Sequence, residues 1–199
     1  MDIGWTIVQG QKLVWEKPER LSVYMNEEYR KSDVKTCIAS NDLLKNIFVI
    51  KSPFDIHLSY IDGKLLLNKE NSSLSYESFI KEFGNVTDQY TNYPMIQMAT
   101  KYVFITDKTC NLTILPPFNN KEYVDYDSNT RVVSGSFNIY DWQRPLSYAI
   151  EWFDTSKDLI IKTGQPLFYI MFNSEKLDDN FELKYMETKK LYDLIDKCT

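Results

Sequence analysis

The chain has 199 residues, with 23 Lys and Arg against 28 Asp and Glu, which gives a formal net charge of −5. With 43% hydrophobic residues it can bury a sizeable core as one domain without metals or disulfides. The negative balance disfavours nucleic acid as a partner, because phosphate binding needs clustered Lys and Arg. We therefore expect a single domain over residues 1–199 that does not bind nucleic acid.

The first ten residues, MDIGWTIVQG, lack the basic region and the apolar stretch of a signal peptide. No apolar run approaches the ~20 residues that span a bilayer. The cysteines Cys37, Cys110 and Cys198 are odd in number and widely spaced, which disfavours a disulfide framework and a structural zinc site. The sequence thus predicts a reduced, cytoplasmic protein with no membrane partner, no bound metal and no cofactor.

Short strands dominate the first half of the chain. We expect strands at residues 49–50 and 55–61, the second alternating with period two, and at residues 64–67. Asp62-Gly63 stands between two of these runs and is the strongest hairpin signal, because a type I′ turn needs two positive φ values. Ser75 is placed to cap a helix over residues 76–83, with Gly84 as its stop.

The second half of the chain continues this pattern. Further strands are expected at residues 101–106, 111–115, 131–139, 146–153 and 159–161, with a long polar loop over residues 119–130. A Thr163-Gly164-Gln165 turn leads into a strand over residues 166–172. Pro166 cannot donate to a ladder, so it should open that strand or lie at an edge.

An amphipathic helix is expected over residues 187–197, with Leu191, Leu194 and Ile195 on the face that packs against the sheets. Many short strands with few helices favour a mostly β fold, an antiparallel β-sandwich or jelly roll with one or two peripheral helices. In this view residues 1–34 are an N-terminal extension, residues 35–186 the β core and residues 187–199 a C-terminal helix.

The only histidine, His57, excludes more chemistry than it offers. Iron and zinc sites that need two or three histidines cannot form within one chain, and any Ser–His or Cys–His nucleophile pair would have to use His57. It stands in an alternating strand on the same face as Asp55 and Ser59. The simplest interpretation is a solvent-side histidine, and the alternative is a binding or acid–base residue.

The richest local cluster begins at Asp141-Trp142-Gln143-Arg144 and continues to Tyr148 and Trp152. A Trp face and a planar Arg cation suit a ring, a carboxylate or a protein partner. The alternative is structural, with the Trp packed on the sandwich and Arg144 paired with Asp141 or Glu151. The predicted binding residues are Trp142, Arg144, Asp141, Tyr148, Trp152 and His57.

A pattern of turn and strand-end residues runs through about two thirds of the chain. A glycine-led strand ends in an aspartate beside an aromatic, an aromatic strand follows, and a basic-x-Gly-x-Pro-x-aromatic turn leads into the closing strand. The matching positions are Gly135, Asp141, Trp142, Trp152, Lys162, Gly164, Pro166 and Phe168. The matching segments are Lys35-Thr36-Cys37 and residues 54–61, 101–105, 112–117, 133–142, 146–153 and 161–170.

In these segments the chain resembles a family of uncharacterised proteins, a domain of unknown function found in bacteria and in tailed phages, notably those of marine hosts. The resemblance implies a jelly-roll-like fold and a phage source, which would place the protein in the host cytoplasm or in the virion. The family has no established activity, so the resemblance assigns no catalytic residue.

These observations favour a non-enzymatic phage or bacterial accessory protein that binds a protein partner or a small ligand through an aromatic-rich face. One alternative is a metal-independent, cupin-like enzyme (an isomerase, lyase or hydrolase) that uses His57, Asp141, Glu151 or Tyr148 as acid–base groups. The other is a virion structural component, for which a symmetric homo-oligomer is expected.

Overall fold

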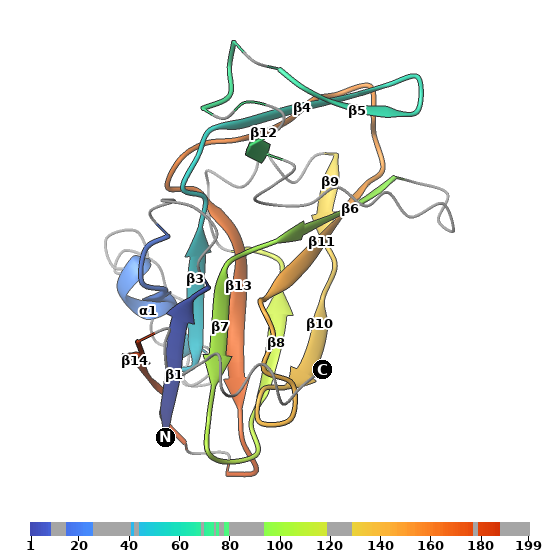
Figure 1. Ribbon diagram of the computed structural model, residues 1–199. Coiled ribbons are helices and arrows are strands. Elements are labelled where there is room, and N and C mark those ends of the chain that lie inside the picture. Colours follow the sequence, from blue (N-terminus) through green and yellow to red (C-terminus); the bar gives the residue numbers. More distant parts are fainter. Residues whose placement is uncertain are drawn as a thin grey trace.

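The computed structural model describes residues 1–8, 15–25, 41, 44–68, 70–73, 75, 78–79, 94–118, 129–176 and 179–187. Across these residues the regular structure is almost all β-strand, and the helix with defined bounds is the four-residue α1 (Leu21–Tyr24). The strands form sheets that stack on one another (Figure 1). The expected mostly β, sandwich-like fold is therefore confirmed.

Four sheets make up the described part of the chain. The N-terminal sheet has the order β14 (Glu182–Tyr185), β1 (Asp2–Ile7), β7 (Tyr102–Ile105). The five-stranded sheet has the order β10 (Gly135–Asn138), β8 (Asn111–Leu115), β13 (Pro166–Asn173), β3 (Ile47–Lys51), β2 (Glu19–Arg20). The side sheet has the order β6 (Met95–Ala99), β11 (Ser147–Trp152), β9 (Thr130–Val132). The upper sheet has the order β12 (Leu159–Ile161), β4 (Ile56–Ile61), β5 (Lys64–Leu67).

The N-terminal sheet and the side sheet form one continuous layer in front of the five-stranded sheet (Figure 1). The backbone N–H of Thr100 donates to the Leu146 carbonyl at 2.8 Å, and the Leu146 N–H donates to the Tyr102 carbonyl at 2.8 Å. These bonds carry the pairing across the bend between β6 and β7. All strand pairs among the described residues are antiparallel except β1 with β14, which is parallel.

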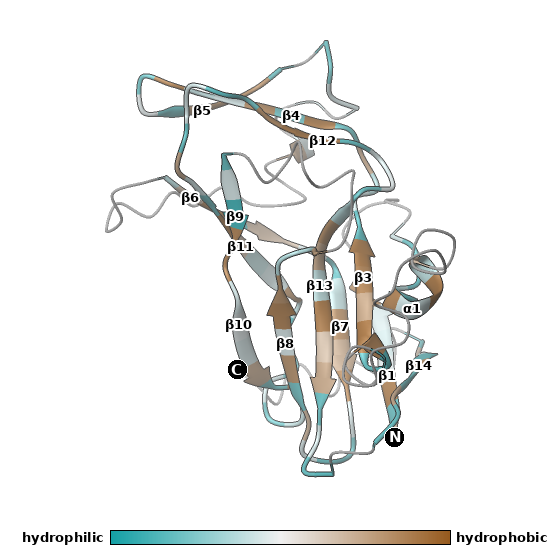
Figure 2. Cartoon of the chain, turned by 180° about the vertical axis from the view of Figure 1, so that it is seen from behind, coloured by the Kyte–Doolittle hydropathy of each residue, from teal (hydrophilic) through white to brown (hydrophobic). Residues whose placement is uncertain are grey.

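Aromatic rings fill the space between the two layers. The Phe172 ring of β13 lies 5.7 Å from the Phe48 ring of β3 and 5.6 Å from the Phe104 ring of β7, centroid to centroid. The strands β3, β8 and β13 at the centre of Figure 2 are largely brown, the colour that marks hydrophobic residues. Burying one such ring stabilises the fold by about 1.5–3 kcal/mol relative to leaving it in water.

A bend joins the five-stranded sheet to the upper sheet, because β3 continues into β4 and β12 continues into β13. The Asp55 carboxylate accepts hydrogen bonds from the Thr163 backbone N–H at 2.7 Å and from the Thr163 hydroxyl at 3.0 Å. The Gly164 N–H donates to the Ser52 carbonyl at 2.7 Å, and Gly164 has a φ of 84°. The predicted 163–165 turn is therefore the corner that turns the upper sheet over the end of the sandwich (Figure 1).

Several predicted elements match the structure closely. Residues 111–115 form β8 with the expected bounds, and Pro166 opens β13. Asp62 and Gly63 both have positive φ, at 50° and 74°, as a type I′ hairpin requires. The Ser75 hydroxyl accepts the Ser78 N–H at 3.2 Å, which is the predicted helix cap.

Other predictions differ from the structure or lie outside the described residues. The single strand expected over residues 131–139 is two strands, β9 and β10, because the chain passes from the side sheet to the five-stranded sheet at Val133 and Ser134. The segment 1–34, expected to be an extension, supplies β1 at the centre of the N-terminal sheet. Residues 188–197 of the C-terminal helix and residues 119–128 of the polar loop lie outside the described residues, as do most of the helix over 76–83, Cys37 and Cys198.

Candidate functional site

The most promising site is a hollow of about 480 Å³ where the chain leaves the side sheet after β9 and enters the five-stranded sheet as β10. Its lining comes mainly from β10, β11 and the loop between these strands. Among the described residues that line it, Arg144 alone carries a charge. The lining residues are Gln97, Ile114, Val133, Ser134, Gly135, Ser136, Phe137, Trp142, Arg144, Pro145, Leu146, Ser147, Tyr148 and Ala149.

Trp142 and Arg144 form the polar and aromatic wall of this hollow. The Trp142 ring meets the Phe137 ring edge-on, with centroids 5.0 Å apart and planes at 76°. The Arg144 guanidinium carbon lies 5.4 Å from the centre of the Trp142 ring, a cation–π contact. Trp142 is 45% exposed. A planar cation therefore lies over a flat ring at an exposed surface.

Asn138 holds the loop that carries Trp142. Its side-chain oxygen accepts the Tyr140 N–H at 3.0 Å, its side-chain nitrogen donates to the Asp141 carboxylate at 2.6 Å, and its carbonyl accepts the Trp142 N–H at 3.0 Å. Asn at the first position of a turn favours this arrangement, since its side chain bonds its own backbone two residues on. Asp141 thus supports the loop beside the hollow and does not line it.

Tyr148 and Trp152 were expected on a binding face, yet both lie in the core. Tyr148 is 2% exposed, its hydroxyl contacts the Met98 sulfur at 3.2 Å, and it reaches the hollow from within. Trp152 is 0% exposed, and its indole N–H donates to the Asp154 carbonyl at 3.1 Å. Period-two alternation along β11 turns both side chains inward, so Trp152 offers no surface to a partner.

The predicted acid–base groups are not brought together. Glu151 pairs with Arg131 at 2.5 Å. One prediction was that Glu151 would pair with Arg144, and the ion pair in the structure is instead with Arg131. Asp141 bonds Asn138, and the Tyr148 hydroxyl is buried against sulfur. The expected pair between Asp141 and Arg144 stays a prediction.

His57 stands in the upper sheet and does not line this hollow. Its Nε2 lies 2.7 Å from the Asp158 carboxylate, and its side chain is only 12% exposed, so it is less open to solvent than expected. The His57 hydrogen bond, together with one from Ser59, holds the pKa of Asp158 below its usual value. In the cluster of His57, Ser59 and Asp158, the Asp158 carboxylate is therefore the residue to which the other two bond. In a Ser–His–Asp nucleophile the histidine must be central.

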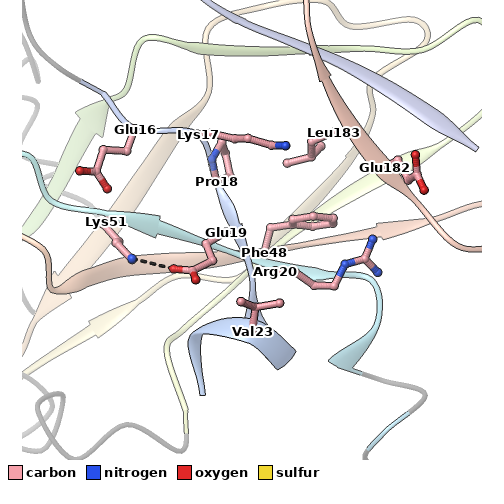
Figure 3. Close-up of a pocket in the computed structure, with 10 residues that line it drawn as sticks. All are labelled: Glu16, Lys17, Pro18, Glu19, Arg20, Val23, Phe48, Lys51, Glu182 and Leu183. Atoms are coloured by element: carbon pink, nitrogen blue, oxygen red, sulfur yellow. Dashed lines mark hydrogen bonds and ion pairs between the residues drawn. The ribbon is translucent and has the colours of Figure 1, made fainter. Parts of the chain in front are cut away.

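A second hollow, of about 490 Å³, opens at the opposite edge of the sandwich between β2, β3 and β14 (Figure 3). Three of its charged side chains, those of Glu19, Arg20 and Lys51, have partners within the protein. Lys51 pairs with Glu19 at 2.8 Å. Arg20 donates to the Asn180 side chain at 2.8 Å and to the Phe181 carbonyl at 2.6 Å, and it stacks over Phe48. The Arg20 contacts therefore join the N- and C-terminal parts of the fold at this hollow.

Metal-binding and reactive groups are sparse in the described ranges. These residues contain no group of three or more His, Cys, Asp and Glu side chains that could hold a metal ion. Cys110 is buried, and burial raises the pKa of its thiol to about 11, which keeps it protonated at neutral pH. None of the described helices has the length and apolar character needed to cross a membrane.

The comparisons with known proteins add no relative. No protein-family model matches the sequence. No curated protein resembles it closely enough to count as related.

Sequence reasoning found one wall of the hollow and missed the other. Trp142, Arg144 and Tyr148 lie close together in the chain, so a local cluster was enough to predict them. Gln97 and Gly135 line the same hollow only because β6 and β10 are brought there by pairing with β11 and β8. Gly135 did stand out as the glycine that leads its strand.

Proposed function

We propose that this protein is a non-catalytic binding protein and that the hollow at Trp142 and Arg144 holds its ligand. The ligand would be a protein segment or a small molecule that presents an apolar or aromatic group next to a carboxylate. The observation that carries the proposal is the half-exposed Trp142 ring with the Arg144 cation over it. A guanidinium binds carboxylates in a planar, two-pronged way, and tryptophan is enriched where binding energy concentrates.

The alternative of a metal-independent enzyme has less support. Its four candidate groups, His57, Asp141, Glu151 and Tyr148, are spread over the upper sheet, a loop and the side sheet, each bonded to a different partner. Acid–base chemistry needs such groups within hydrogen-bond reach of one reacting atom. The binding proposal needs only the two side chains that already stand together.

The resemblance to proteins of bacteria and tailed phages suggests the biological setting. We place this binding role in a phage or bacterial accessory protein that acts in the cytoplasm. A place in the virion is the alternative if the protein forms a symmetric oligomer.

The experiment uses two small probes that differ only in charge, indole-3-acetate and indole-3-acetamide. Each is titrated into ¹⁵N-labelled protein while amide signals are followed by NMR. We expect signals of hollow residues such as Gly135 and Ala149 to shift, with a dissociation constant of about 1 mM for the acid, as suits a ligand of this size. The amide should bind several-fold more weakly, because it lacks the charge that pairs with Arg144.

Matched variants identify the residues responsible. Trp142→Ala should weaken both probes, whereas Arg144→Ala should remove the preference for the acid. Arg131→Ala and Tyr185→Ala serve as controls, because both side chains are exposed and neither lines the hollow. Shifts confined to other surfaces, or equal binding by the wild type and the Trp142→Ala variant, would count against the proposal.

A further inference from the structure

The hollow runs beside a strand whose outer edge pairs with no other strand among the described residues. β10 is the last strand of the five-stranded sheet in the described part of the chain. Ser134, Gly135 and Ser136 are exposed, and a Cβ placed on Gly135 would meet nothing within 4 Å. An edge strand presents unpaired backbone N–H and C=O groups, which form a template for another strand.

The register shows which backbone groups face outward. Ile139 donates to the carbonyl of Cys110 at 2.9 Å, and these two residues continue the pairing of β10 with β8 directly opposite each other. In an antiparallel ladder, bonded and non-bonded pairs alternate along the strand. Gly135 and Phe137 therefore bond to β8, whereas the N–H and C=O of Ser136 point away from it, toward the open edge.

Side-chain alternation then sets what an added strand would place in the hollow. Gly135 and Phe137 lie opposite Ile114 and Leu112, two buried residues of β8, and Ile114 also lines the hollow. The backbone of Ser136 borders the hollow too, but its hydroxyl accepts a hydrogen bond from Thr113 at 3.0 Å on the other face of the sheet. In a strand added beside β10, every second side chain would point the same way as Phe137. Those side chains would enter the hollow and meet Trp142 and Arg144.

We infer that the ligand of this site is an extended segment of a partner protein, which adds as a strand to β10 and places apolar and acidic side chains in the hollow. The inference rests on the proposed function and names the class of partner. Backbone bonds to Ser136 would supply affinity, and the pocket for alternate side chains would supply specificity. Arg144, the only charged lining residue in the described chain, gives the preference for a carboxylate.

The same charge argues against a second copy of this chain as the occupant. A self-paired edge would bring β10 against β10, and residues 133–139, VSGSFNI, contain no acidic side chain. Such a pair could not offer a carboxylate to Arg144 from the added strand. An acidic segment of another protein fits the hollow better.

The probe is a library of random twelve-residue peptides, selected against the wild-type protein and then synthesised with both ends blocked. Two changes at one position test strand addition. Ser136→Pro removes the outward N–H and places a ring on the edge, and proline is tolerated at edge strands. Ser136→Ala keeps the N–H and controls for the lost hydroxyl bond to Thr113. We expect the proline variant to bind the selected peptides at least about tenfold more weakly and the alanine variant to stay within about twofold of the wild type.

Amide hydrogen exchange gives a readout that does not depend on the proline variant folding. In the free protein the Ser136 amide should exchange quickly and the Phe137 amide slowly, because only the latter bonds to β8. Saturating peptide should slow Ser136 exchange at least about tenfold, since its N–H gains a partner. Unchanged Ser136 exchange in the presence of bound peptide would overturn the inference.

The outcomes separate this inference from the proposed function. If Trp142→Ala and Arg144→Ala weaken peptide binding but Ser136→Pro does not, the hollow binds its ligand without strand addition, and only the inference fails. If none of the three changes matters, both fail. A library that yields no peptide with a dissociation constant below about 100 μM also overturns the inference. So does a peptide-free dimer that Ser136→Pro dissociates, because the occupant is then a second copy.

Discussion

At the scale of single residues, position relative to the strand decides whether an aromatic side chain is core or site. Trp142 and Trp152 belong to one aromatic cluster in the sequence, yet the first is 45% exposed and the second 0%. Trp152 occupies an inward position of β11, and Trp142 sits in the turn before that strand. A turn frees its side chains from the period-two rule, so a residue there can serve a ligand without loosening the core.

The two tryptophans should therefore differ in their effect on stability. Trp152→Ala leaves a large cavity between the side sheet and the upper sheet, where its ring lies 6.1 Å from that of Tyr60. We expect it to lower the free energy of unfolding by about 3–5 kcal/mol. Trp142→Ala removes a half-exposed ring and should cost about 1 kcal/mol or less. Urea denaturation followed by circular dichroism measures both, and similar losses in the two variants would contradict this assignment.

At the scale of elements, the corner between the upper sheet and the five-stranded sheet depends on one carboxylate. Asp55, in the connection between β3 and β4, bonds the backbone and the hydroxyl of Thr163, in the connection between β12 and β13. The Thr163 N–H is the largest cause that holds the pKa of Asp55 below its usual value, and Lys162 adds to the effect. These hydrogen bonds join the β3–β4 and β12–β13 connections, which lie far apart in the chain, and so hold the corner together.

Removing this carboxylate should loosen the corner in a pH-dependent way. Asp55→Ala loses its bonds to Thr163 and should lower the free energy of unfolding by about 1 kcal/mol at pH 7. Because the folded pKa of Asp55 is lowered, its contribution is present above the ordinary Asp pKa and disappears as the pH falls through the folded value.

The measurement is a series of urea denaturations from pH 7 to pH 3. Wild-type stability should fall more steeply than that of Asp55→Ala at the acidic end, so the gap between the two curves should narrow there. Asp107→Ala is the control, since that aspartate is exposed and lies in a different turn. Parallel curves for the wild type and Asp55→Ala would show that the carboxylate does not hold the corner.

Elements with strong local signals could be predicted, and elements defined by their neighbours could not. Buried and more exposed residues alternate along β8, and the strand ends at Leu115, just before Pro116, so its bounds could be predicted from the sequence. β14 buries only Leu183, and β2 has two residues, so neither carries a pattern of its own. The passage of the chain from one sheet to another at Val133 and Ser134 was not predicted. Alternation of polar and apolar residues shows which face of a strand is buried, but it does not show which sheet the strand joins.

At the scale of the whole molecule, the two edges of the five-stranded sheet differ. The β2 edge is fastened to the C-terminal part of the chain, since Arg20 bonds Asn180 and the Phe181 carbonyl. The β10 edge is exposed and bordered by the hollow. Because contacts with the C-terminal part of the chain fasten the β2 edge, the β10 edge can stay available to a partner while the core remains buried. The open edge beside the candidate site is therefore a property of the strand order, which no local motif reports.

The first strand shows how the chain ends contribute to this closure. β1 lies between β14 and β7, and its side chains Ile3 and Trp5 are buried in the same core as the strands from the second half of the chain. Ile3→Ala should therefore lower the free energy of unfolding by about 2–4 kcal/mol, as expected for a buried aliphatic residue. Asp2→Ala, which breaks only an exposed ion pair with Lys184, should change it by less than about 0.5 kcal/mol.

Deleting residues 2–7 removes all of β1 and tests whether this strand is an integral part of the fold. The deletion exposes the facing edges of β7 and β14 and removes three buried side chains, those of Ile3, Trp5 and Thr6. We therefore expect the shortened protein to lose its cooperative thermal transition and its dispersed NMR spectrum. A detachable N-terminal extension would behave differently, leaving the transition within a few degrees of the wild type. The Ile3→Ala and Asp2→Ala pair distinguishes loss of core packing from loss of surface charge, because only the first should reproduce the direction of the deletion.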